Sequence, residues 1–252
     1  MRRKTTAVRI GNVVLSSEEP VLVQSMLNTS TREVDACVEQ AIRIIEAGGR
    51  LVRITAPGVK EAEMLGEIHR RLRERGYTTP ISADIHFVAE AASVAARYVE
   101  KVRINPGNFA DKRATFKKLT YTDEEYAAEL EILRQKFTEF LEVCRQYGTA
   151  VRIGTNHGSL SDRIMSRYGD TPAGMVEATM EYLRVCQACD FKDVVISLKS
   201  SDCRTMVDAV RLLVEKMEAE GMCYPLHLGV TEAGEGEDGR IRSAVGLSLI
   251  HI

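Results

Sequence analysis

Four basic residues stand at similar positions in four short apolar segments. Arg53, Arg103 and Arg152 each occupy the centre of a Val-Arg-Ile triplet, and Lys199 follows the apolar run Val194–Leu198. An arginine fork suits phosphate oxygens in particular, and lysine adds a compact positive charge. If these segments are strands of one parallel barrel, their ends meet at one mouth and the four cations share one cavity. This pattern favours a polyanionic ligand, because cations without a counter-charge repel one another and lose solvation.

The alternative is that carboxylates inside the protein hold these cations. Asp84 and Glu232 follow two further apolar segments and are available for that role. For any single arginine the two interpretations are equally good, because buried ion pairs are common. Four cations at equivalent positions, with two acids nearby, favour an anionic ligand.

Polar groups follow the same apolar segments and complete a candidate site. Asp, His and Glu side chains at such positions can move protons, although a single histidine is as often a structural hydrogen-bonding group. Glycines nearby let backbone N–H groups approach a phosphate. The candidates for proton transfer are Asp84, His86, His227 and Glu232, and the candidate polar contacts are Asn105, Asn108, Asn156 and Ser159.

The apolar segments that carry these residues are typical of parallel strands covered on both faces. Each is short, nearly continuous and rich in valine or isoleucine. A preceding pair of runs, Ala7–Ile10 and Val13–Leu15, flanks Gly11-Asn12 and predicts a hairpin that closes the floor of a barrel. The predicted strands are Val21–Gln24, Leu51–Thr55, Ile81–Ile85, Lys101–Ile104, Ala150–Ile153, Val194–Leu198 and Pro225–Leu228.

Helical segments separate the strands. Ser30–Glu33 and Thr122–Glu125 have the spacing of a capping box, and Thr171-Pro172 is a typical helix start. The long connection Phe109–Gly148 predicts an extended or additional helix. Repeated strand–helix units with seven predicted strands favour an α/β fold of the TIM-type (β/α)8 barrel class, ending before the eighth strand. The first strand is not followed by a GxGxxG motif, which argues against a dinucleotide-binding fold.

Composition excludes some classes of function. The 252 residues are 44% hydrophobic with a formal net charge of −2, so a large core can form and a nucleic-acid-binding footprint is not expected. The basic start Met1–Lys4 lacks the apolar run of a signal peptide or membrane span, so we expect a cytoplasmic protein. Cys186 and Cys189 form a CxxC pair near the end of a predicted helix, and Cys186 continues its apolar stripe. Packing is therefore favoured over metal binding.

Four segments identify a family resemblance. ADIHF (83–87), VRINPGN (102–108), VRIGTNHGSL (151–160) and HLGVTEAG (227–234) closely resemble the 4-hydroxy-3-methylbut-2-enyl diphosphate synthases, in this order and spacing. The resemblance runs from Val8 to Gly246 and is closest to the three-domain form of the family. It implies reductive ring opening and dehydration of 2-C-methyl-D-erythritol 2,4-cyclodiphosphate. It also implies a [4Fe–4S] cluster that receives electrons from ferredoxin or flavodoxin.

The resemblance assigns roles to the candidate residues. It implies that Arg53, Arg103, Arg152 and Lys199 bind the diphosphate, that the asparagines and Ser159 make polar contacts, and that the acids and histidines surround the substrate. The family's cluster ligands, three cysteines and a glutamate of a C-terminal domain, match no position here. Residues 247–252 depart from the family pattern. We therefore expect an incomplete barrel domain over residues 1–246, without the iron–sulfur domain and without turnover of its own.

Two rival functions are compatible with the same residues. A dihydropteroate-synthase-like transferase barrel also has a mouth rich in Asn, Asp, Lys and Arg and binds a diphosphate, but it uses a pterin and no iron. A barrel that binds a phosphate ligand without catalysis is the non-enzymatic alternative. Binding of the cyclic diphosphate or of a pterin diphosphate would distinguish the first two.

Overall fold

A curled parallel sheet lies at the centre of the molecule. The structure is a computed structural model that describes residues 3–86, 88–111 and 120–251. Within them, β3 to β8 pair in chain order, each strand parallel to the next. The bounds are β3 (Gln24–Met26), β4 (Leu51–Thr55), β5 (Ile81–Asp84), β6 (Lys101–Ile104), β7 (Ala150–Asn156) and β8 (Val194–Lys199).

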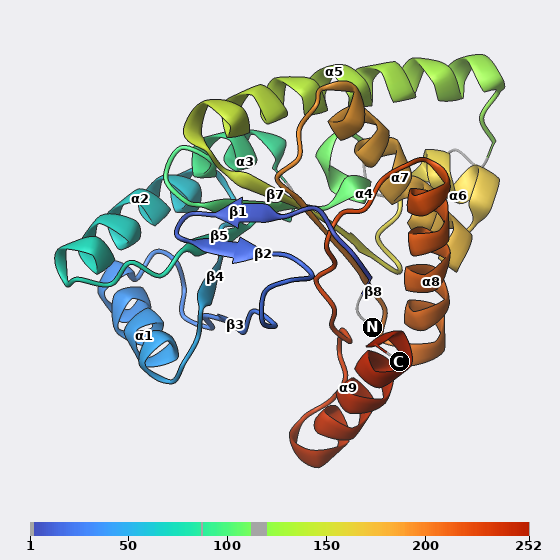
Figure 1. The fold of residues 1–252 in the computed structure, drawn as a ribbon. Coiled ribbons are helices and arrows are strands. Elements are labelled where there is room, and N and C mark those ends of the chain that lie inside the picture. Colours follow the sequence, from blue (N-terminus) through green and yellow to red (C-terminus); the bar gives the residue numbers. More distant parts are fainter. Residues whose placement is uncertain (1–2, 87, 112–119, 252) are drawn as a thin grey trace.

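Helices cover the outer face of this sheet (Figure 1). The arrangement is a half-barrel, with each long connection between strands carrying a helix, and it confirms the expected parallel α/β architecture. The longer helices are α1 (Val34–Glu46), α2 (Val59–Glu74), α5 (Asp123–Tyr147), α7 (Pro172–Ala188), α8 (Cys203–Ala219) and α9 (Gly236–His251). The shorter ones are α3 (Ala89–Ala95), α4 (Pro106–Phe109) and α6 (Asp162–Tyr168).

A small hairpin closes the amino-terminal end of the half-barrel. β1 (Val8–Ile10) pairs antiparallel with β2 (Val13–Leu15), and Gly11 takes a positive φ of 56° in the turn between them. Residues of this hairpin pack against the strand-start residues Leu51 and Ala150. The predicted floor hairpin is therefore confirmed.

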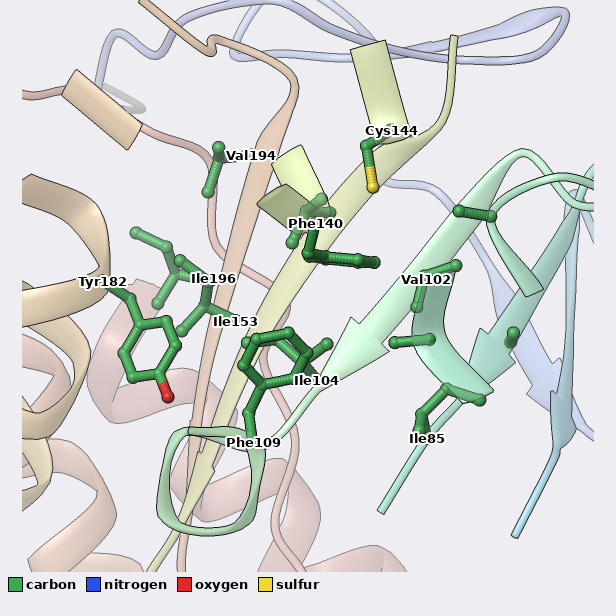
Figure 2. Packing of buried hydrophobic residues seen from close by; sticks show 14 of the residues in the cluster. Ile85, Val102, Ile104, Phe109, Phe140, Cys144, Ile153, Tyr182, Val194 and Ile196 are labelled. Atoms are coloured by element: carbon green, nitrogen blue, oxygen red, sulfur yellow. The ribbon is translucent and has the colours of Figure 1, made fainter. Parts of the chain in front are cut away.

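The main core lies between the sheet and its helices. In β4, β6 and β7, the core valine and isoleucine alternate with inward-facing residues, so their side chains reach the helices on the outside. Figure 2 shows Phe109, Phe140 and Tyr182 meeting over Ile104 and Ile153. The Phe109 and Phe140 ring centroids are 5.3 Å apart. Because α4 and α5 lie between β6 and β7, and α7 lies between β7 and β8, these rings join two successive connections of the half-barrel.

Helix starts agree with the sequence in two of three cases. Thr122 forms the expected capping box with Glu125 at the start of α5, and the Thr171 hydroxyl accepts from the Gly174 N–H at the start of α7. The capping box predicted at Ser30 is wrong. The Ser30 carbonyl accepts from the Glu33 N–H in a turn, and α1 begins only at Val34 without a side-chain cap.

The predicted strand Pro225–Leu228 is reduced to an isolated bridge. Leu226 pairs parallel with Ile196 of β8, and the His227 N–H donates to the Ile196 carbonyl at 2.7 Å. Pro225 has no N–H to donate, which limits the ladder at this point. The segment nevertheless runs beside β8 and places His227 near its inner face. None of the described helices combines the length and apolar character that a membrane crossing requires.

Glu100 joins three elements at the floor. Its carboxylate accepts from His69 and Arg73 of α2, and from the Ile81 N–H at the start of β5 at 2.7 Å. Burial acts to raise the pKa of Glu100, but the hydrogen bonds from His69 and Ile81 outweigh it and hold the pKa below its ordinary value. The carboxylate is therefore charged in the folded protein at neutral pH.

Glu100→Ala is expected to lower the free energy of unfolding by about 1–3 kcal/mol, because it leaves the Ile81 N–H without an acceptor. Since the folded pKa of Glu100 is depressed, its contribution is present above the unfolded pKa and is lost as pH falls through the folded value. Urea unfolding at pH 7 measures the effect. Glu131→Ala, which removes an exposed pair with Arg134, serves as the control and should change stability by less than about 1 kcal/mol. Equal effects of both variants would contradict the assigned role.

Candidate functional site

One buried carboxylate organises the basic residues of the half-barrel. Asp84 is the last residue of β5 and is 1% exposed. Its carboxylate pairs with Arg53, lies 3.3 Å from Arg103 Nη1 and lies 3.7 Å from Arg152 Nη2. Three of the four predicted cations therefore share a single acid.

Strand alternation explains this convergence. Val52 and Ile54 pack outward into the main core, so Arg53 between them faces inward. In the sheet register, Asp84 stands beside Arg103, and Arg103 stands beside Arg152. Neighbouring strands thus bring together the side chains of Asp84, Arg103 and Arg152, which lie far apart in the chain.

A fifth cation joins this cluster and was missed by the sequence argument. Lys101 is 2% exposed, and its Nζ donates to Gln24 Oε1 at 3.0 Å across the sheet interior. Burial, followed by the charges of Arg152 and Arg53, lowers the pKa of Lys101 well below its ordinary value. The signal was present, because Lys101 stands two residues before Arg103 on the same strand and therefore faces the same side.

The cluster has more N–H donors than acceptors. The five basic groups share one acid, Asp84, which pairs with three of them and acts on the other two through its charge: Arg53, Arg103, Arg152, Lys101 and Lys199. Both Nε and Nη1 of Arg152 are buried without a hydrogen-bond partner, as is Nε of Arg103. Buried donors of this kind cost free energy unless something accepts from them. An anion with several oxygens supplies the missing acceptors.

The two histidines border the cluster from two segments, one that follows β5 and one that runs beside β8. His86 Nε2 lies 2.8 Å from the Asp84 carboxylate, and its ring also lies 3.3 Å from Arg103 Nη1. Burial, followed by the positive charges of Arg152 and Lys101, holds the pKa of His227 well below its usual range. His227 is therefore a neutral imidazole at physiological pH, beside a cluster of cations.

Lys199 stands at the open end of the cluster. It is the last residue of β8, pairs in register with Asn156 and is only half-buried. Burial, followed by the charges of Arg152 and Arg53, lowers the pKa of Lys199 to about 7. A Cβ placed on Gly229 would lie 3.2 Å from its Nζ, so a glycine at this position leaves room for the amine.

The predicted polar contacts lie at the end of β7 and in the segments that directly follow β6 and β7. Asn105 accepts from the Gly107 N–H and starts α4, and Asn108 donates to the His86 carbonyl at 3.1 Å. The Asn156 carbonyl accepts from the Ser159 N–H. A Cβ on Gly107 would lie 1.7 Å from the Ser159 carbonyl oxygen, so the two loops are in direct contact and only glycine fits there. These residues therefore fix the loops around the cations.

Glu232 is the predicted site residue that lies apart from the others. It is exposed, has a positive φ of 55° and makes no ion pair with the five cations in the part of the chain that the structure describes. It lines a cleft of about 820 Å³ beside the start of α9, with Val230 and Arg240. The idea that Glu232 neutralises the basic residues is therefore wrong, whereas Asp84 does so for three of them.

The cations of the cluster line neither this cleft nor a second one. The second cleft, of about 690 Å³, lies between the loops after β3 and β4 and includes Thr55. Thr55 pairs in register with Asp84, so this cleft opens next to the cluster. The guanidinium groups of Arg53, Arg103 and Arg152 pair with Asp84 instead of lining either cleft.

The residues present do not fit an iron–sulfur cluster. Over the described ranges, no group of three or more His, Cys, Asp or Glu side chains could hold a metal ion. Cys186 is fully buried in the main core, as expected for packing, and Cys189 ends α7 with its thiol near Thr138.

Comparisons with known proteins agree on the fold. A family described as the GcpE TIM-barrel domain matches residues 5–251. Among solved structures, an N-acetylneuraminic acid synthetase from Leptospira borgpetersenii superposes with a TM-score of 0.57 at 10% identity, covering 93% of this chain and 73% of that one. A type I 3-dehydroquinate dehydratase from Clostridium difficile gives 0.54 at 8% identity, covering 90% and 81%. At such identities the likeness concerns the fold alone.

Curated relatives are much more similar in sequence. A 4-hydroxy-3-methylbut-2-en-1-yl diphosphate synthase (flavodoxin) from Parabacteroides distasonis is 61% identical over 249 residues, which is 99% of this chain and 41% of the relative. A chloroplastic 4-hydroxy-3-methylbut-2-en-1-yl diphosphate synthase (ferredoxin) from Arabidopsis thaliana is 50% identical over 250 residues, covering 99% and 34%. The chain thus spans about two fifths or less of the length of these relatives.

Proposed function

The chain belongs to the GcpE TIM-barrel family, and from this premise we propose that it is the substrate-binding barrel of a 4-hydroxy-3-methylbut-2-enyl diphosphate synthase. The whole enzyme reductively opens 2-C-methyl-D-erythritol 2,4-cyclodiphosphate and releases water. The curated relatives carry the name of this activity. The role proposed for this chain is to bind and orient the cyclic diphosphate.

The excess of buried cations carries the proposal. Asp84 is in contact with three guanidinium groups, and Arg152 retains two buried N–H groups without an acceptor. Two phosphate groups would bring several oxygens and at least two negative charges to this cluster. In this proposal Arg53, Arg103, Arg152 and Lys199 hold the phosphates.

The remaining candidates surround the bound ligand. Asn105, Asn108, Asn156 and Ser159 set the loops that cover it. Asp84 holds the guanidinium forks in position and accepts a hydrogen bond from His86. His86 and the neutral His227 are the proposed proton carriers nearest to the cations, whereas Glu232 could reach the ligand only through a movement of its loop.

Electron delivery is proposed to lie outside these residues. The names of the relatives specify flavodoxin or ferredoxin. We propose that the same class of donor reduces a [4Fe–4S] cluster in the complete enzyme, with ligands from other parts of it. The part played here by the barrel residues is binding, orientation and proton placement.

Calorimetric titration of the purified chain tests the proposal. The cyclic diphosphate should bind with measurable heat, and a pterin diphosphate at the same concentration should bind at least tenfold more weakly. Arg134→Ala, an exposed substitution on α5, should leave binding unchanged. Equal or tighter binding of the pterin compound would refute this function and support a transferase barrel instead.

A further inference from the structure

Lys199 is more accessible than Arg103, Arg152 and Lys101, as is Arg53. Arg103, Arg152 and Lys101 are each 2% exposed or less, whereas Lys199 is half-buried at the open end of β8. Gly229 leaves space beside its Nζ. A small molecule that enters the mouth can therefore reach this amine before it reaches Lys101.

The surroundings of Lys199 are cationic on several sides. Its pKa is lowered by burial and by the positive charges of Arg152 of β7, Arg53 of β4 and Arg103 of β6. His227 of the segment beside β8 is neutral. Asp84 of β5 is the one carboxylate among the charged groups that shift the pKa of Lys199. This carboxylate is already shared by the three arginines. Within the described residues Lys199 forms no ion pair. Such an environment disfavours the ammonium form.

The neutral amine is the nucleophilic form of lysine. Burial and the neighbouring arginines lower the pKa of Lys199 to about 7, so far more of its amine is neutral near physiological pH than in an ordinary lysine. The guanidinium groups beside it can hold a phosphate at the same time. A nucleophile and an anion-binding cluster therefore share one mouth.

We propose that Lys199 is a covalent modification site, at which its amine forms an imine with aldehydes that carry a phosphate group. The amine nitrogen attacks the aldehyde carbon, and a carbinolamine forms. The carbon–oxygen bond then breaks, the oxygen leaves as water and a C=N bond takes its place. No electrons are exchanged, and the phosphate stabilises the positive charge of the protonated imine.

The inference does not depend on the identity of the natural substrate. It rests on the position of Lys199 beside the guanidinium groups. A site proposed to bind a diphosphate without a covalent bond would then also bind phosphate-bearing aldehydes covalently. Occupation of that site by the aldehyde would block the entry of another anion. A phosphate-bearing aldehyde would thus act as a slow, reversible inhibitor of the barrel.

Pyridoxal 5′-phosphate is the probe for this inference. Incubation of the 252-residue chain with a small excess, followed by borohydride reduction and peptide mass spectrometry, should place the label on Lys199. Labelling should increase with pH around a midpoint near 7, as expected from the pKa of Lys199. Pyridoxal without its phosphate should label at least tenfold more slowly, and inorganic diphosphate should slow the reaction.

Matched variants separate reactivity from folding. Lys199→Arg replaces the nucleophilic amine with a guanidinium group and should abolish the label. Lys192→Arg removes an exposed lysine beside Asp190 and should leave labelling at Lys199 unchanged. Label spread over surface lysines, or equal rates with and without the phosphate, would overturn the inference. Diphosphate binding without Lys199 labelling would refute it and leave the proposed function intact.

Discussion

Asp84→Asn is expected to lower the free energy of unfolding by about 3–5 kcal/mol, the cost of leaving buried charges without a partner. Asp84 is 1% exposed and is the acid that contacts Arg53, Arg103 and Arg152. Burial acts to raise the pKa of Asp84, but His86 and the arginines outweigh it and hold the pKa far below its usual range. The side chain is therefore a carboxylate throughout the neutral range, and asparagine removes a full charge.

The size of this destabilisation depends on pH and on the presence of a ligand. Because the folded pKa of Asp84 is depressed, its contribution to stability exists above the unfolded pKa and declines as pH falls below it. Inorganic diphosphate should restore part of the loss, since binding to the folded state at 100 times its Kd adds about 2.7 kcal/mol. The rescue should be larger in Asp84→Asn than in the parent chain, because the variant has more unpaired positive charge.

Urea unfolding at pH 7, with and without diphosphate, measures both quantities. Asp35→Asn is the control, because Asp35 is 85% exposed and its pair with Arg71 should contribute at most about 1 kcal/mol. An Asp84→Asn chain as stable as the parent would contradict the view that this carboxylate holds the cluster together.

The sequence predicted the parallel sheet well because the strands are short, apolar and regularly separated by helices. Five predicted strands overlap the observed ones closely, and β4 and β6 match in full. The first strand is displaced from Val21–Gln24 to Gln24–Met26. Val21 is 71% exposed and Val23 is 59% exposed, so these two apolar residues are not buried in the sheet as the sequence argument assumed.

The convergence of Arg53, Arg103 and Arg152 was predictable because it follows from period-two alternation and parallel register. The sharing of the Asp84 carboxylate among these three arginines was not predictable, because it depends on side-chain positions across neighbouring strands. Lys101 was missed for a different reason. It begins its strand, whereas the candidate cations were sought near the carboxyl ends of the strands, and its side chain is long enough to cross the interior to Gln24.

Glu232 shows where spacing alone fails. It follows the segment beside β8, and its distance along the chain suggested a place at the mouth. After His227 the chain turns, with positive φ at Glu232 and Gly234, and continues into α9. Turns of this kind depend on local backbone geometry that apolar periodicity does not encode. Its proposed role in catalysis therefore requires a loop position other than the one observed.

Arg152→Met is expected to have opposite effects on stability and on binding. Arg152 is 1% exposed, keeps two N–H groups without partners and lies 3.7 Å from an acid that two other arginines already hold. Burial, followed by the charges of Arg53 and Arg103, lowers its pKa well below the ordinary value. Removing it relieves repulsion and keeps the packing, so the unliganded chain should gain about 1–3 kcal/mol.

The same substitution should weaken binding of the cyclic diphosphate by about 1.5–3 kcal/mol, or about ten- to 150-fold, because it removes a charge-assisted contact. Calorimetry and urea unfolding on one preparation give both values, with the exposed Arg134→Met as the control. A structural ion pair behaves differently, since its loss lowers stability and leaves binding unchanged. Destabilisation by Arg152→Met with unaltered affinity would therefore show that the arginine serves the fold, and a stabilised chain with weakened affinity would show that it serves the ligand.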